Sequence, residues 1–538
     1  MFHILLLLAA TGARGQTADL VITGARIYTP QKEASAIAVK DGRILAVGGD
    51  VSGYVGPGTR RIDARGATII PGLIDSHVHM ESLGDSLEFL DLRNVRSVAE
   101  IAELVRREAA RLPAGEWIRG RSWDQTHWGG RFPTAQELAA AAPNHPVYLT
   151  RVDGHAAWVN PKALELAGID RATPDPPGGK IIRDSAGAPT GVLIDRAEGL
   201  VTRKMPPATR EATVRRLRAA ARECARLGLT TVHDAGVSAQ GLAAYRELIA
   251  RGELPVRVYA MIGGQGKPWR EYLARGPEIG DRLTVRSIKL MADGALGSRG
   301  AALAEPYSDD PGNTGLLMLK REDIERVARE AVKAGFQVNT HAIGDRANRM
   351  VLEAYGAALG GRNDRRFRIE HAQVVAPADF ELFAKYSVIA SMQATHATSD
   401  MRWAEARLGP ERVRGAYAWR RFLSLGVPVP NGSDFPVEEP NPLYGFHAAI
   451  TRQDRAGNPP AGWFPDQRMT REEALKSWTM VGAYAAFEEG QKGALEPGKL
   501  ADMVLLSADI MRIPPAEILK TRVKMTILGG EVVYPEGK

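Results

Sequence analysis

The stretch GLIDSHVHM, residues 72–80, ends an apolar run with two histidines placed two positions apart. Residues i and i+2 of a β-strand lie on the same face, so His77 and His79 are expected to point in one direction. Two imidazoles on one face can hold a metal ion. Two polar residues where a strand meets a loop would give the same pattern, so the rest of the chain must decide.

Seven more strand-like runs follow this one. In chain order the eight are ATIIPGLIDSHVH (67–79), LTTVHDAG (229–236), PVRVYAMIG (255–263), VRSIKLMADG (285–294), GFQVNTHAIGD (335–345), RFRIEHAQV (366–374), SVIASMQATH (387–396) and VPVPNGSDFP (427–436). Most gaps after the second run hold a helical pattern, such as REDIERVAREAVKAG. Alternating β and α units favour a parallel sheet, and eight of them predict a (β/α)8 TIM barrel. An open doubly wound sheet is the alternative, but no Gly-rich dinucleotide loop is present.

The two chain ends are built from short β-rich runs separated by Gly, Asp and Pro. We therefore expect residues 16–70 and 488–538 to pair into a small composite β-domain, a β-sandwich, with the barrel at residues 71–487. The gap from Met80 to Gly228 is too long for one helix. We interpret residues about 110–205 as an α/β insertion after barrel strand 1, on the active-site face.

The first fifteen residues, MFHILLLLAATGARG, resemble a secretory signal with cleavage after Gly15. They predict an exported protein, periplasmic or secreted, although no Lys or Arg precedes the apolar run. That run, Ile4 to Ala10, is too short to span a bilayer, and no Cys follows it for lipid attachment. No stable membrane anchor is expected.

Composition and charge exclude several classes of protein. The chain has 538 residues, 44% of them hydrophobic, which excludes a wholly disordered chain. The net charge is +7, but the basic residues are scattered among acidic ones, and no nucleic-acid-binding motif is visible. Cys224 is the single cysteine, so no intramolecular disulfide can form.

Metal-ligand residue types stand at the ends of five of the predicted strands. They are His77, His79, Lys289, His341, His371 and Asp434. Placing Lys289 inward puts Ile288 and Leu290 outward against the helices, which suits a barrel. RIEH fits this register less well, because Arg368 and Glu370 would then face outward.

Imidazoles and carboxylates suit zinc and similar divalent ions. Six ligands are too many for one tetrahedral ion, so two ions with a bridging hydroxide as nucleophile fit better. A bare ammonium cannot bind a cation, but a lysine carboxylated on its amine is an anion and can bridge two metals. The alternative for Lys289 is a structural ion pair with Asp293.

The chain resembles the amidohydrolase superfamily, and within it the amidohydrolase-3, N-substituted formamide deformylase-like family. The resemblance covers nearly the whole mature chain. Its motifs, in family order, are PGLIDSHVH, DGHAAWVNPKAL, KLMADGALGSRGAAL, THAIGDRA, RIEHAQ, AYAWRRFLSLGVPVPNGSDFPVEEPNPL and GALEPGKLADMVLL.

The resemblance implies a role for each strand-end residue. His77 and His79 hold the first metal with Asp434, and His341 and His371 hold the second. Lys289, N-carboxylated, bridges the two. Asp434 is also the catalytic residue that carries a proton from water to the leaving nitrogen. The number of ions, one or two, varies in the superfamily.

Four residues are candidates for substrate binding. They are His155 in the insertion, Arg299 after the fourth strand, His396 at the end of the seventh strand, and Trp123. A structural loop role is the alternative for His155, and packing of the insertion is the alternative for Trp123. Together with Trp128, Trp158 and Tyr148, Trp123 favours an apolar substituent on the substrate.

The function expected from these features is metal-dependent hydrolysis of a C–N bond in a small molecule, by attack of a metal-bound hydroxide. The substrate would be an amide, N-acyl or N-formyl amine. A deaminase or cyclic-amide hydrolase on the same scaffold is one alternative. A non-catalytic exported binding protein is another, although all six expected ligands are present. The sequence leaves homo-oligomerisation open.

Overall fold

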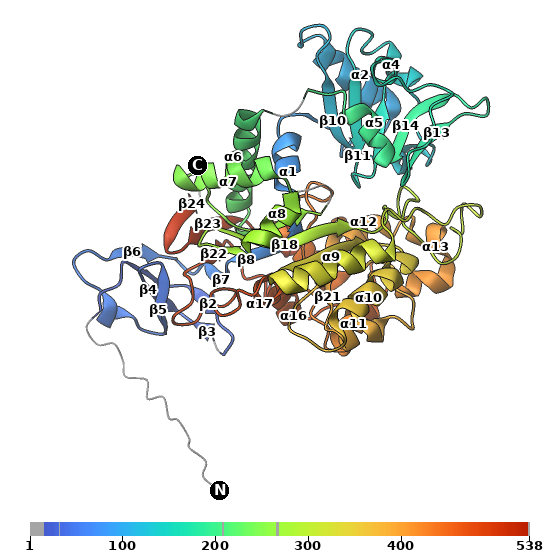
Figure 1. Cartoon of the computed structure of the whole chain (residues 1–538). Coiled ribbons are helices and arrows are strands. Elements are labelled where there is room, and N and C mark those ends of the chain that lie inside the picture. The colour runs from blue at the N-terminus through green and yellow to red at the C-terminus, as the bar shows by residue number, and fades with distance from the viewer. Residues whose placement is uncertain (1–15, 32, 207–208, 265–267, 536–538) are drawn as a thin grey trace.

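The structure is a computed structural model that describes residues 16–31, 33–206, 209–264 and 268–535. The expected signal segment, residues 1–15, lies outside the described residues. In the described part of the chain, no helix combines the length and apolar character needed to cross a membrane. A central barrel carries a β-rich region made from the chain ends and a separate lobe that follows the first barrel strand (Figure 1).

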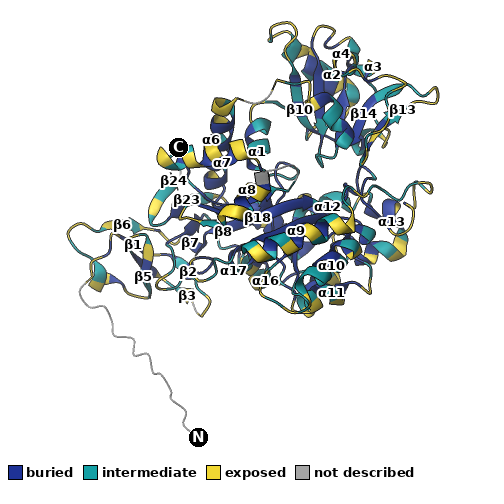
Figure 2. Cartoon of the chain, in the orientation of Figure 1, coloured by how far each residue is buried: buried dark blue, intermediate teal, exposed yellow. Residues whose placement is uncertain are grey.

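Seven parallel strands follow one another around the barrel, each hydrogen-bonded to the next. In sheet order they are β8 (Leu73–Val78), β15 (Leu229–Val237), β16 (Arg257–Gly263), β18 (Leu283–Met291), β19 (Gln337–Ala342), β20 (Arg368–His371) and β21 (Ile389–Ser391). A short antiparallel strand, β17 (Glu278–Ile279), pairs with β18 outside this ring. The strands are largely buried because side chains fill the barrel on one face and helices cover the other (Figure 2).

Residues 428–435 take the eighth position of the barrel without forming a regular strand. The carbonyls of Pro428 and Pro430 accept backbone hydrogen bonds from the end of β21. On the other side, Asp434 donates its backbone N–H to the carbonyl of His77 in β8, at 2.8 Å. These bonds close the sheet. The predicted (β/α)8 fold class is therefore confirmed, and the open doubly wound sheet is excluded.

The outer helices pack on the barrel through apolar stripes. In α9 the buried residues are Ile324, Val327, Ala328 and Ala331, at the i, i+3, i+4, i+7 spacing of one helix face. That helix ends at Gly335, whose φ of 77° is the left-handed conformation of a glycine cap. The barrel-associated helices are α1 (Met80–Ser86), α6 (Arg210–Arg226), α7 (Ala239–Ala250), α8 (Pro268–Arg275), α9 (Arg321–Ala334), α10 (Asp345–Leu359), α11 (Phe380–Tyr386), α12 (Ala394–Asp400), α13 (Ala404–Arg412), α14 (Trp419–Ser424), α15 (Pro442–Thr451), α16 (Arg471–Ser477) and α17 (Met480–Ala485).

Two sheets form the region built from the chain ends. The first has the order β5 (Arg43–Gly48), β4 (Ala36–Lys40), β1 (Leu20–Thr23) and β6 (Arg60–Asp63). The second has the order β24 (Glu531–Pro535), β23 (Val523–Leu528), β22 (Met503–Leu506), β7 (Thr68–Pro71), β2 (Arg26–Tyr28) and β3 (Glu33–Ala34). Strand β22 from the C-terminal part pairs antiparallel with β7 from the N-terminal part. Both sheets contribute to one apolar core, which contains Leu20 and Ile37 from the first and Ile69 and Met503 from the second.

The lobe after β8 is a six-stranded sheet with short helices. Its sheet order is β13 (Gly179–Arg183), β14 (Pro189–Asp195), β12 (Ala156–Val159), β11 (Val147–Arg151), β10 (Ile118–Trp123) and β9 (Leu90–Asp91). Its helices are α2 (Val98–Ala109), α3 (Gln136–Ala139), α4 (Pro161–Ala167) and α5 (Gly199–Thr202). The lobe begins earlier than the expected residue 110, because β9 pairs with β10 and the Ile101 and Val105 side chains of α2 share its core. We call this lobe, from Leu90 to Thr202, the insertion.

Candidate active site

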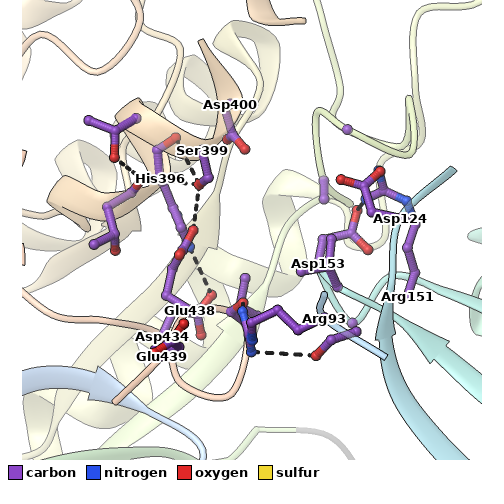
Figure 3. Close-up of a pocket in the computed structure, with 18 of the residues that line it drawn as sticks. Arg93, Asp124, Arg151, Asp153, His396, Ser399, Asp400, Asp434, Glu438 and Glu439 are labelled. Atoms are coloured by element: carbon purple, nitrogen blue, oxygen red, sulfur yellow. Dashed lines mark hydrogen bonds and ion pairs between the residues drawn. The ribbon is translucent and has the colours of Figure 1, made fainter. Parts of the chain in front are cut away.

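A cavity of about 500 Å³ lies at the C-terminal ends of the barrel strands, between the barrel mouth and the insertion. Figure 3 shows Asp124, Arg151 and Asp153 of the insertion on one side and His396, Asp400, Asp434 and Glu438 of the barrel on the other. Five of the six expected metal ligands line this cavity, namely His79, Lys289, His341, His371 and Asp434. The sixth, His77, lies directly beneath them.

His77 is fully buried at the end of β8 and contacts three of the other polar groups. Its Nε2 atom is 3.0 Å from the Lys289 amine and 3.6 Å from a carboxylate oxygen of Asp434. Its Nδ1 atom is 2.6 Å from Oε2 of Glu370 in β20. Nε2 therefore points to the centre of the site while Nδ1 is held by a carboxylate.

Asp434 occupies the centre of the donor group. Its Oδ1 atom is 3.2 Å from Nε2 of His79, and single donor atoms of His77, His371 and Asp434 lie within 4.8 Å of one another. The backbone places the carboxylate there, because Asp434 has a φ of 57°, in the left-handed region. Such strained positions are common at functional sites.

The imidazoles of β19 and β20 complete the group. The ring centres of His341 and His371 are 4.6 Å apart, and those of His77 and His371 are 4.8 Å apart. Nδ1 of His371 is 2.8 Å from Oε1 of Gln393, which leaves Nε2 for another partner. His341 is the last residue but one of β19, and its Nε2 is 3.4 Å from a carboxylate oxygen of Asp293.

Lys289 lies among these donors and does not form the alternative ion pair with Asp293. Asp293 instead accepts backbone hydrogen bonds from Ala302, Ile343 and Gly344 at 2.8–3.0 Å. No carboxylate of the described residues is within ion-pair distance of the Lys289 amine. Burial lowers the pKa of this amine, which favours its neutral form.

The charge states of these side chains suit a bound cation. Burial lowers the pKa of His77, His341 and His371, so each imidazole is neutral and has a lone pair to offer. Although burial alone would raise it, the contact with Nε2 of His79 is the main cause that holds the pKa of Asp434 well below its usual range. Asp434 Oδ1 is buried without a well-aligned hydrogen bond. Four imidazoles and an ionised carboxylate with a free oxygen fit a divalent metal of the zinc type.

The strand register explains how these residues converge. The observed burial of Arg368 and Glu370 differs from the outward position that this register implied. Ile288 and Leu290 do lie in the main apolar core while Lys289 reaches into the barrel, as alternation requires. Arg368 and Glu370 were expected to face outward, but both are fully buried inside the barrel.

Glu370 reaches His77, and the Arg368 guanidinium is 3.0 Å from Nδ1 of His233. His371 still reaches the site because its φ of 75° breaks the alternation at the strand end. Glu370 is therefore a site residue that the strand pattern missed. Its position directly before His371, one of the expected ligands, in RIEH was the available signal.

Two of the four predicted substrate residues line the cavity. The ring of His155 is 5.2 Å from that of His341, and its Nδ1 is 2.6 Å from Asp195. His396 has Nε2 at 3.9 Å from Asp434 Oδ2. It lies in α12 rather than at the end of β21, because that strand stops at Ser391 and the chain turns into a helix.

The other two predicted substrate residues do not line the cavity. Trp123 is fully buried in the insertion core, where its indole N–H donates to the carbonyl of Leu149 at 2.7 Å. Arg299 is held by Asp309 at 3.1 Å and is absent from the cavity wall.

The other aromatic residues of the insertion also face away from the cavity. Trp128 and Trp158 pack around Trp123, and Tyr148 donates its hydroxyl to Glu198 at 2.6 Å. These rings pack in the cores of the insertion and do not line the cavity. These aromatic residues therefore do not form the expected apolar wall of the pocket. The insertion side of the cavity consists mainly of charged and polar residues.

Comparisons with known proteins agree with this architecture. A family profile described as "Amidohydrolase family" matches residues 60–534. The chain is 33% identical to the putative amidohydrolase YtcJ of Bacillus subtilis, over 95% of this chain and 98% of that protein. It is 28% identical to an N-substituted formamide deformylase of Arthrobacter pascens, over 96% of this chain and 99% of that protein.

A solved structure is similar over nearly the same length. It is the crystal structure of an uncharacterized metal-dependent hydrolase from Pyrococcus horikoshii, with a TM-score of 0.75 and 29% sequence identity. The similarity covers 92% of this chain and 99% of that one. It therefore includes the chain-end sheets, the barrel and the insertion together.

Proposed function

The chain belongs to the amidohydrolase family and is a metal-dependent hydrolase of carbon–nitrogen bonds, and we propose that it cleaves small-molecule amides to an amine and a carboxylic acid. N-acyl and N-formyl amines are the substrate types proposed first. The observation that carries this proposal is the convergence of His77, His371 and Asp434 at the barrel mouth, with their donor atoms within 4.8 Å. The similarity to a formamide deformylase supports the same bond type.

The proposed cofactor is zinc or a similar divalent ion. His77, His79 and Asp434 would hold one ion, and His341 and His371 a second, with Lys289 between them. When bound, such an ion lowers the pKa of water towards about 7 and polarises the carbonyl that water attacks. The free lone pairs of the buried imidazoles and the lowered pKa of Asp434 support this assignment.

The protein's own groups supply the positioning and the proton transfer. Glu370 holds Nδ1 of His77, so that Nε2 faces the reaction centre. Asp434 accepts the proton of the attacking water and delivers it to the leaving nitrogen, which is a poor leaving group unless protonated. His155, held by Asp195, lies beside His341 where it can donate a hydrogen bond to the substrate.

A substrate panel combined with metal analysis tests this proposal. The panel contains N-acyl amines, N-formyl amines, N-acyl amino acids, cyclic amides, lactones and aminopurines. Amide cleavage should lead, and a chelator should abolish it until metal is restored. Activity confined to aminopurines or cyclic amides would replace the reaction with that of a deaminase or cyclic-amide hydrolase. Stoichiometric binding without turnover of any compound would indicate a binding protein.

We also propose that Lys289 is N-carboxylated. Carbamate formation needs a neutral amine, and the buried amine of Lys289 has a lowered pKa. The test is a crystal structure of fully metallated protein grown with added bicarbonate. Density for a carboxylated amine between two ions is expected. A plain amine in that structure would reject the bridging role without affecting the other ligands.

Export remains a proposal that rests on the sequence of residues 1–15. The apolar run and the small residues before position 16 resemble a cleaved signal. Expression in a bacterial host followed by mass analysis of the purified protein is the test. A mature chain that begins at Gln16 in the periplasmic fraction is expected, whereas an intact chain in the cytoplasm would reject it.

A further inference from the structure

The charges on the insertion side of the cavity fall into two groups. Arg151 is fully neutralised, because its guanidinium contacts Asp124 at 3.2 Å and Asp153 at 2.5 Å, and its Nε bonds to Gln125 at 2.7 Å. Asp124 is shared with Arg402 of the barrel. This network needs no ligand to balance its charge, and it ties the insertion to the barrel beside the cavity.

Arg93 and Arg121 also line the cavity, as Arg96 does, but no carboxylate of the described residues is paired with any of them. Arg93 donates to the carbonyls of Val437 and Pro436 at 2.7 and 2.5 Å, and to the Ser122 hydroxyl at 3.4 Å. Nε of Arg121 is buried and has no hydrogen-bond partner among the described residues. No acidic side chain of the described residues forms an ion pair with either guanidinium.

The two guanidinium groups act on each other. Burial and the positive charge of Arg93 lower the pKa of Arg121, and the carboxylates of Asp434, Glu198 and Asp153 only partly offset this. Placing two like charges together in a partly buried site costs free energy unless an anion joins them. The arrangement is therefore incomplete without a negative group in the cavity.

Alternation along β10 places Arg119 and Arg121 on the same face of the strand. A β-bulge interrupts the pairing of β10 with β11 between Arg121 and Trp123, and Ser122 there has a φ of 77°. This bulge follows Arg121 and turns Trp123 to the opposite face, into the insertion core with Ile118. Arg119, two residues earlier in β10, is instead paired with Asp85 at 3.0 Å.

The position of Arg121 relative to the donor group sets where the anion would lie. Its Nη2 atom is 3.4 Å from the point that a Cβ on Gly154 would occupy, and Gly154 precedes His155. The ring of His155 contacts that of His341 in the proposed metal site. An anion on Arg121 would thus lie on the insertion side, with the reacting amide between it and the barrel mouth.

We propose that Arg121, assisted by Arg93, binds a carboxylate of the substrate, and that the substrates are amides that carry a carboxylate. The planar guanidinium fork matches a carboxylate through two parallel charged hydrogen bonds. This inference rests on the proposed amide hydrolysis and adds the substrate class to it. It replaces the apolar substituent that the sequence analysis had favoured with a charged one.

Matched substrate pairs test the inference on the wild-type holoenzyme. N-acetylphenylalanine is compared with N-acetylphenethylamine, which lacks its carboxylate. N-phenethylsuccinamate, with the carboxylate on the acyl side, is compared with N-phenethylbutyramide. At least one carboxylated amide should exceed its neutral partner in kcat/KM by about tenfold to a hundredfold, as expected for charged hydrogen bonds. Equal or better cleavage of both neutral amides overturns the inference while leaving amide hydrolysis in place.

Variants then locate the effect on Arg121. Arg121→Gln should remove the preference for the carboxylated amide, chiefly through KM, and Arg121→Lys should retain part of it. Arg119→Gln is the matched control, because Arg119 lies on the same strand, has its own carboxylate partner and does not line the cavity. A preference that survives in a folded, metallated Arg121→Gln protein would reject the assignment.

A binding measurement separates this inference from the proposed reaction. Calorimetry with 3-phenylpropionate, which cannot be hydrolysed, should show about tenfold or greater loss of affinity in Arg121→Gln at unchanged metal content. The Arg119→Gln protein should bind it as the wild type does. If every amide is inert, the proposed reaction fails, and this measurement still decides whether Arg121 binds a carboxylate. Unchanged affinity in Arg121→Gln would show that it does not.

Discussion

The barrel mouth and the insertion face the same cavity, but they contribute to it in different ways. The barrel brings donors with free lone pairs to one point, and few of them are neutralised by a neighbour. The insertion brings charged residues that are mostly paired with each other, as Arg151 is with Asp124 and Asp153. Arg93, Arg96 and Arg121, which line the cavity and form no ion pair with a described residue, are the exception. The contrast separates the proposed metal site at the strand ends from the proposed carboxylate site on the insertion.

The largest effect is expected at the barrel mouth. His77→Ala should lose bound metal and lower turnover by about 10³-fold or more, because the metal supplies several kcal/mol of transition-state stabilisation. Metal analysis and amide hydrolysis measure it. His145→Gln is the control, since His145 lies outside the cavity with Nδ1 at 3.0 Å from the Glu116 carbonyl. Full metal occupancy in a His77→Ala, His79→Ala double variant would disprove the metal assignment.

Asp434→Asn should separate metal binding from proton transfer. The amide can still offer an oxygen, so part of the metal should remain, but it cannot accept the proton from water. Turnover should fall by roughly 10²- to 10⁴-fold. A near-normal rate at normal metal content would mean that another group carries the proton.

Glu370→Gln tests whether a residue behind the ligands belongs to the barrel-mouth site. Losing the charged acceptor of His77 Nδ1 should weaken metal affinity by about 10- to 100-fold. Competition with a metal-binding dye measures this change. Addition of excess metal should restore most of the rate, whereas a loss that excess metal cannot restore would indicate a role in the chemical step.

The pH dependence of stability probes the insertion side. Burial alone would lower the pKa of His155, but the hydrogen bond to Asp195 and nearby carboxylates raise it to about 9. A raised histidine pKa stabilises the fold below the unfolded value of about 6.5, and this contribution is lost as pH rises towards 9. Denaturation measures the free energy of unfolding of wild type and His155→Gln between pH 6 and 9.5. The difference between the two proteins should shrink by up to roughly 3 kcal/mol as the pH rises. Parallel profiles would mean that His155 is not protonated.

The smallest effect is expected inside the insertion. Trp123→Phe removes the indole N–H that bonds to Leu149 and should lower the stability of the fold by about 1 kcal/mol. KM for the best amide should not change, because Trp123 does not line the cavity. A change in KM with unchanged stability would restore Trp123 as a substrate contact and weaken the division between the two regions.

Sequence patterns determined the barrel and brought the expected metal ligands to its mouth. The strands alternate with helices, and parallel strand ends must meet at one edge of the barrel, so His77, Lys289 and His341 had to lie close together. The period of two along a strand also placed Ile288 and Leu290 against the helices. These features depend only on the order of residues along the chain, which the sequence gives directly.

Tertiary structure decided the features that depend on which distant segments meet. Left-handed backbone at His371 let both Glu370 and His371 face inward, against simple alternation. Trp123 packs in the insertion core because the bulge at Ser122 moves it off the face that Arg121 presents to the cavity. Whether an arginine is neutralised depends on which carboxylates folding brings near it. Asp85 is brought to Arg119, whereas no carboxylate of the described residues is paired with Arg121. A strand pattern carries no record of those partners, since charge pairing is set by distances in space.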